Sequence, residues 1–66
     1  MTRKDYQLIV DSLARAWRLC ETRSQQRGVE RAHGALVQSL AKDNPRFDAV
    51  RFRLAFWDSV ERKVWP

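Results

Sequence analysis

The chain has 66 residues, of which 44% are apolar and 32% charged, and 13 Lys and Arg against 8 Asp and Glu give it a net charge of +5. A chain of this length has room for one domain only, and it buries about 60% of its unfolded surface. The apolar fraction excludes a disordered chain. A single cysteine excludes an internal disulfide, and no apolar run resembles a signal peptide or a membrane span, so we expect a cytoplasmic protein.

A first helix is expected over residues 3–20. Thr2 and Asp5 have the spacing of a capping box, in which each side chain accepts a hydrogen bond from a backbone amide at the helix start. At 100° per residue, one stripe about 100° wide collects most of the apolar side chains, which is typical of a core-facing surface. Leu8 and Leu19 lie outside this stripe. The stripe consists of Tyr6, Ile9, Val10, Leu13, Trp17 and Cys20.

A second helix is expected over residues 28–43. The polar residues before it, 21–28, lack periodicity and end in a glycine, which favours a connection between helices. Asn44 precedes Pro45 and is therefore biased away from helical geometry, which ends the helix. Gly34, in its interior, costs about 1 kcal/mol relative to Ala. The apolar stripe of this helix is Val29, Ala32, Leu36 and Leu40, flanked by His33 and Val37.

A third helix is expected over residues 48–63, with Asp48 as its cap. Its apolar residues occupy two sides: Phe52, Phe56 and Val60 on one, and Val50, Leu54 and Trp57 on the other. One broad face is enough for the core of a three-helix domain, so the second side predicts contact with a dimer partner or a target. The sequence therefore predicts an all-α, small three-helix domain that spans residues 1–66.

The sequence indicates no catalytic site and no cofactor. Nucleophilic catalysis needs a nucleophile, a base and an orienting group, and the residues of these types are isolated. Cys20 is expected to pack in the core, and His33 to lie at a helix edge, without a second metal ligand at the required spacing. We therefore expect a protein that is not an enzyme. Two pairs four residues apart are expected to be structural ion pairs: Asp11 with Arg15, and Asp58 with Arg62.

The partner-binding residues are expected on and after the third helix. A domain this small buries about four or five large rings, which leaves Trp57 and Trp65 for an interface. On a helix, Arg53 lies between Phe56 and Trp57, among the apolar residues. It is a candidate for the interface because Trp and Arg are the residue types that most often dominate binding energy. Arg51 and Arg62 would add charge at the rim. Partner binding is therefore assigned to Arg51, Arg53, Trp57, Arg62 and Trp65.

Two segments resemble small phage and prophage proteins: residues 2–9, TRKDYQLI, and residues 44–52, NPRFDAVRF. In such proteins the second segment implies a corner between helices, with Phe47 and Phe52 pointing inward and Asp48 capping. The members end soon after the second phenylalanine, whereas this chain continues to residue 66.

What the resemblance implies about function is inhibition by binding. Small phage proteins commonly occlude a host machine, and anti-CRISPR inhibitors are among them. The resemblance therefore implies a phage or mobile-element protein that acts in the host bacterial cytoplasm. It would bind a host defence complex, a CRISPR-Cas effector, and block it stoichiometrically.

Two alternatives use the same residues. A basic nucleic-acid-binding or transcription-regulating domain would contact phosphates through Arg15, Arg18, Arg51 and Arg53. The cations, however, are spread over the chain with acids between them, whereas nucleic-acid binders usually concentrate charge on one face. The other alternative is a helical homodimer whose third helix closes the interface.

Overall fold

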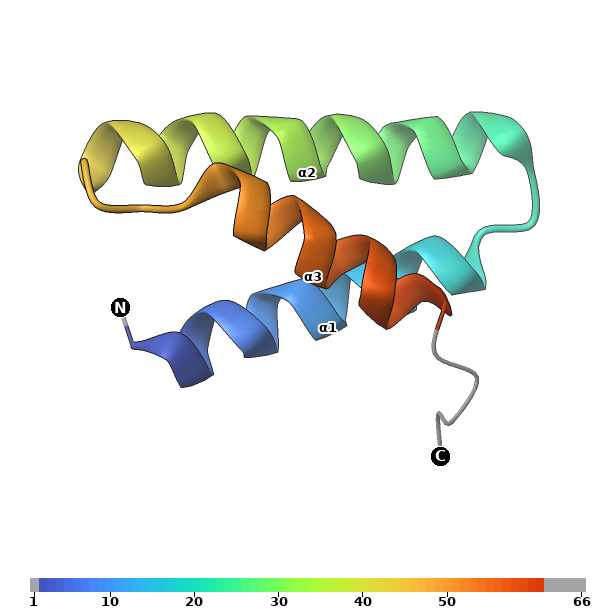
Figure 1. Ribbon diagram of the computed structural model, residues 1–66. Helices are drawn as coiled ribbons and strands as arrows, with labels where there is room; N and C mark the ends of the chain where they lie inside the picture. The colour runs from blue at the N-terminus through green and yellow to red at the C-terminus, as the bar shows by residue number, and fades with distance from the viewer. Residues whose placement is uncertain (1, 62–66) are drawn as a thin grey trace.

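A computed structural model of the chain describes residues 2–61, which form three α-helices (Figure 1). Helix α1 is Arg3–Leu19, α2 is Arg23–Asp43 and α3 is Ala49–Glu61, and no strand occurs among the described residues. The predicted all-α, three-helix class is confirmed. Both ends predicted for α1 and the start predicted for α3 agree to within one residue. The end predicted for α3, residue 63, lies outside the described residues.

The three helices pack unequally. In Figure 1, α2 runs back antiparallel to α1, and α3 starts beside the end of α2 and descends across α1. The most extensive contact is between α1 and α3, and the smallest is between α2 and α3. Helix α1 is therefore the centre of the packing, since α2 and α3 each make their larger contact with it.

The start of α1 is a capping box, as predicted. The Thr2 backbone amide donates to Asp5 Oδ2 at 3.0 Å, and the Asp5 amide donates to Thr2 Oγ1 at 3.3 Å. These reciprocal bonds satisfy backbone donors that have no partner within the helix. They also lower the pKa of Asp5, mainly through the hydrogen bond from the Thr2 backbone.

Helix α2 starts five residues earlier than the sequence predicted, so the interpretation of residues 21–28 as a connection was wrong. Thr22 is the N-cap, and its Oγ1 accepts from the Gln25 amide at 3.1 Å. The Gln25 Oε1 in turn accepts from the Glu21 amide at 2.6 Å. These two local bonds stabilise the helix start before Gly28, which lies inside the helix without a positive φ.

The corner between α2 and α3 follows the predicted chemistry. Asn44 ends α2, where its amide donates to the Leu40 carbonyl at 2.9 Å, and its Oδ1 accepts from the Arg46 amide at 3.0 Å. Asp48 Oδ1 accepts from the Arg51 amide at 3.0 Å and caps α3. The corner is thus fixed by two side chains that mimic backbone turns.

The core lies between the three helices. Phe52 and Phe56 of α3 are buried, as predicted, against one face of α1, and half-buried aromatic rings surround them. The buried apolar residues are Val10, Ala14, Val37, Phe52 and Phe56. Leu8 and Leu19 are exposed, again as predicted.

The core-facing side of α2 differs from the predicted stripe. His33 is only 7% exposed, and it lies at the centre of this side rather than at its edge. Val37 is buried with it, whereas Ala32 is exposed and Leu36 is half-buried. Val29 and Leu40 of the predicted stripe do pack against the core. The centre of the buried side lies at His33 and Val37 because α2 must meet α3 as well as α1.

Cys20 also departs from the prediction. It forms the C-cap of α1, is half-buried, and is not among the residues packed in the core. Its Sγ donates to the Ala16 carbonyl at 3.2 Å. The apolar stripe of α1 therefore ends at Trp17, because the helix ends at Leu19 and Cys20 has extended backbone geometry.

Polar bonds join α1 to α3 along their contact. The Ser59 hydroxyl donates to Asp11 Oδ1 at 2.9 Å, and Gln7 Nε2 also donates to that oxygen at 3.0 Å. Asp11 therefore links α1 to α3 through Ser59, instead of forming the predicted ion pair with Arg15. Arg18 Nε donates to the Val60 carbonyl at 3.0 Å, close to the end of α3.

Candidate functional site

Helix α3 carries an apolar row that the other helices leave exposed, wholly or in part. Val50, Leu54 and Trp57 are spaced as one side of a helix, and their side chains are 68%, 65% and 39% exposed. We call these three residues the outer row of α3. Together they form the second apolar side that the sequence predicted for this helix.

Trp57 is held in place by neighbouring rings. Its ring meets Trp17 of α1 edge to face, with centroids 5.8 Å apart and planes at 80°. It meets Phe56 in the same manner at 4.9 Å and 73°. A ring fixed on two sides loses little conformational freedom when a partner covers its free surface.

Two of the predicted binding arginines flank the outer row. Both Arg51 and Arg53 are exposed. Arg53 lies toward α2, because its charge contributes, after burial, to lowering the pKa of His33. Arg51 lies on the α1 side, where it lines a hollow together with Arg3. Arg62 and Trp65, the other two predicted binding residues, lie outside the described residues.

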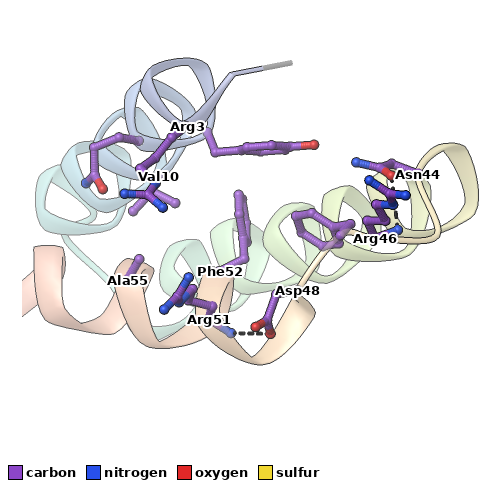
Figure 2. A pocket seen from close by; sticks show the side chains of 11 residues that line it. Arg3, Val10, Asn44, Arg46, Asp48, Arg51, Phe52 and Ala55 are labelled. Carbon is purple, nitrogen blue, oxygen red and sulfur yellow. Dashed lines mark hydrogen bonds between the residues drawn. The ribbon is translucent and has the colours of Figure 1, made fainter.

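The hollow beside Arg51 was not predicted. It has a volume of about 300 Å³ and lies between the start of α1, the α2–α3 corner and the first turns of α3 (Figure 2). We call it the arginine hollow. It is lined by Arg3, Tyr6, Gln7, Val10, Asn44, Arg46, Phe47, Asp48, Arg51, Phe52 and Ala55. Most of these residues belong to the segments 2–9 and 44–52. These segments are far apart in the sequence, and only the fold brings them together.

Three aromatic rings stand in the wall of the hollow. Tyr6 and Phe47 have centroids 5.5 Å apart, and Phe47 and Phe52 have centroids 5.4 Å apart. Tyr6 and Phe47 are half-buried, so part of each ring remains accessible, whereas Phe52 is buried. The wall is therefore aromatic and partly open.

Three arginines from different parts of the chain surround these rings. Arg3 belongs to α1, Arg46 to the corner and Arg51 to α3, and all three are exposed. Figure 2 shows Arg46 beside Asn44 at one end of the hollow, with Arg3 and Arg51 toward the other end. Within residues 2–61, no carboxylate forms an ion pair with these guanidinium groups.

Other chemistry is sparse in the described chain. No group of three His, Cys, Asp or Glu side chains among residues 2–61 is arranged to hold a metal ion. No helix in that range is long and apolar enough to cross a membrane.

Comparisons with protein-family models, curated proteins and solved structures find no match to this chain.

Proposed function

We propose that this protein binds another protein through the outer row of α3 and inhibits it stoichiometrically, without a catalytic step. The observation that supports this proposal is the exposure of Val50, Leu54 and Trp57 along one helix, with Arg51 and Arg53 on either side. An apolar centre with a polar rim is the usual composition of a protein-binding patch, and Arg is enriched in such patches. The predicted Arg62 and Trp65 would extend it.

Burial of the outer row supplies only part of the free energy that tight binding needs. Complete burial of each of the three apolar side chains contributes about 1.5–3 kcal/mol. Association costs about 4–15 kcal/mol in lost freedom, so the arginines must contribute as well. A partner with acidic residues around an apolar groove would satisfy both requirements.

The target that we propose is a host defence complex, a CRISPR-Cas effector, in the cytoplasm of a bacterium that carries a phage or mobile element. The resemblance of segments 2–9 and 44–52 to phage proteins supports this part of the proposal. Such an effector offers acidic protein surfaces to a domain with a net charge of +5.

The experiment is a titration of a purified effector complex with the protein, with binding and target-DNA cleavage as readouts. Leu54→Ala and Arg53→Ala should each weaken binding by about 1–2 kcal/mol, or roughly ten-fold. Leu19→Ala and Arg31→Ala are the matched controls, since Leu19 is 71% exposed on α1 and Arg31 is exposed on α2. Equal losses in variants and controls, or no saturation at one protein per complex, would overturn the proposal.

A second candidate function, nucleic-acid binding, is favoured by one observation. The arginine hollow brings together Arg3, Arg46 and Arg51 without carboxylate partners. The predicted phosphate contact of Arg18 is less well supported, because its guanidinium donates to the carbonyls of Ser59 and Val60. In this candidate the hollow, rather than the outer row of α3, would carry the binding.

A further inference from the structure

We infer that the arginine hollow binds one nucleotide of a single-stranded nucleic acid, with its base against the aromatic wall and its two flanking phosphates at the arginines. The site shares Arg51 with the rim of the proposed protein contact, whereas Arg3, Arg46, Tyr6 and Phe47 belong to the hollow alone. Variants of these four residues therefore test the inference separately from the proposed protein contact.

The positions of the charges match a strand that crosses the hollow. Each nucleotide in a strand has one phosphate on either side of its base. Arg46 lies at one end of the hollow, and Arg3 and Arg51 lie toward the other (Figure 2). Guanidinium groups bind phosphate oxygens through two parallel hydrogen bonds, so a phosphate at each end has a suitable donor.

The wall between the arginines suits a base. Tyr6 and Phe47 are half-buried and 5.5 Å apart, and they stand at an angle of 42° to each other. Base stacking on such rings does not depend on sequence, because every base has an aromatic face. A duplex would not fit, since its bases are stacked on one another and paired.

The acidic group in the lining does not cancel the arginines. Asp48 is the one carboxylate there, and its Oδ1 already accepts the hydrogen bond that caps α3. Three guanidinium groups and one carboxylate leave an excess of positive charge. By contrast, the two hollows along α1 and α2 have no charged side chain in their linings.

The volume favours a nucleotide over an acidic side chain of a protein. About 300 Å³ is at the lower end of the range for sites that hold a small molecule. An aspartate or glutamate side chain would leave most of this space and the ring faces unoccupied. A nucleoside with its phosphates would use the rings and the arginines together.

The experiment measures binding of a fluorescent oligothymidylate of about ten nucleotides, as single strand and annealed to its complement, at several salt concentrations. Arg3→Gln and Arg46→Gln should each weaken single-strand binding several-fold and reduce the slope of log K against log salt by about 0.7. Arg31→Gln is the matched control, since it removes the same charge from an exposed site on α2 outside the hollow. It should leave both quantities nearly unchanged.

Tyr6→Leu supplies a test that does not depend on charge. It should weaken single-strand binding at least five-fold, with helix content and thermal unfolding checked in parallel. If Tyr6→Leu fails to fold, NMR of the wild-type protein replaces this test. On addition of thymidine monophosphate, the changes in backbone amide chemical shift should concentrate on the residues that line the hollow.

Three outcomes would overturn the inference. The first is equal binding of duplex and single strand, with Arg31→Gln as damaging as Arg3→Gln, because that would indicate attraction to charge alone. The second is equal binding of a polyglutamate peptide of the same length, which would assign the hollow to an acidic protein segment. The third is a set of amide shifts that lies outside the hollow.

Discussion

The imidazole of His33 lies against the ring of Phe56, with centroids 4.5 Å apart and planes inclined by 33°. Phe52 stacks on the same imidazole at 5.5 Å and 25°. His33 Nε2 is buried and has no hydrogen-bond partner in the described part of the chain. The single histidine is thus enclosed between two core phenylalanines, an environment that favours its neutral form.

Stability should therefore fall when the pH drops below neutral. Burial lowers the pKa of His33 below its ordinary value of 6.5, the charge of Arg53 lowers it further, and Glu30 opposes the shift. The unfolded chain thus takes up a proton near pH 6.5, whereas the folded protein takes it up only at lower pH. The free energy of unfolding should be fully retained above pH 6.5 and decrease as the pH falls below it.

Urea unfolding at about pH 7.5 and about pH 5.5 measures this decrease. In His33→Leu the core stays apolar and carries no titratable group, so the difference between the two pH values should nearly disappear. A wild-type protein equally stable at both, or a variant that keeps the full difference, would contradict the explanation. The capping carboxylate of Asp5 titrates below its ordinary value of 3.8, outside this window.

Ser59→Ala should destabilise the protein by about 1.5–3 kcal/mol, because it removes a hydrogen bond to a partly buried carboxylate. Ser59 is 2% exposed, and its hydroxyl lies 2.9 Å from Asp11 Oδ1. Chemical denaturation measures the loss, and Ser39→Ala, at an exposed site on α2, is the control. In a double-mutant cycle with Asp11→Ala, additive effects would show that the two side chains are not coupled.

Thr22→Ala should cost about 1 kcal/mol, because Thr22 is the N-cap of α2. Ser24→Ala, two residues farther on, removes a hydroxyl from an exposed position inside the first turn and should have little effect. Thermal unfolding of the two variants measures the difference. If both behaved alike, the helix would begin elsewhere.

Gly28→Ala should stabilise the protein by about 0.5–1 kcal/mol. The residue lies inside α2, and a Cβ atom added to it meets no other atom within 4 Å. Gly34→Ala should act in the same direction for the same reason. A loss of stability in Gly28→Ala would instead indicate the turn at residue 28 that the sequence first suggested.

Phe52→Ala should destabilise the fold by about 3–5 kcal/mol, since Phe52 is buried among the core rings. Trp57→Ala should cost less, about 1–3 kcal/mol, because its ring makes two contacts, with Trp17 and Phe56, each of about 0.5–1.5 kcal/mol. Thermal unfolding ranks the two variants. The reverse order would mean that the inner and outer sides of α3 are interchanged.

Local chemistry alone was enough to predict much of this fold. The Thr2–Asp5 capping box, the helix stop at Asn44 and the Asp48 cap each depend on side chains within a few residues, and each occurs as predicted. The stripe of α1 and the two sides of α3 follow from helical periodicity alone. The start of α2 at Thr22 was not predicted, because the residues that follow it lack apolar periodicity and end in Gly28.

Tertiary structure decided what local rules leave open. Which side of α2 is buried depends on where α3 packs against it. His33 contacts Phe52 and Phe56 of α3 and is buried in the core, whereas Ala32 is exposed. The arginine hollow likewise exists only because the corner after α2 brings Arg46 and Arg51 close to Arg3 at the start of α1. No periodicity encodes such distances, since they depend on how the packed helices cross.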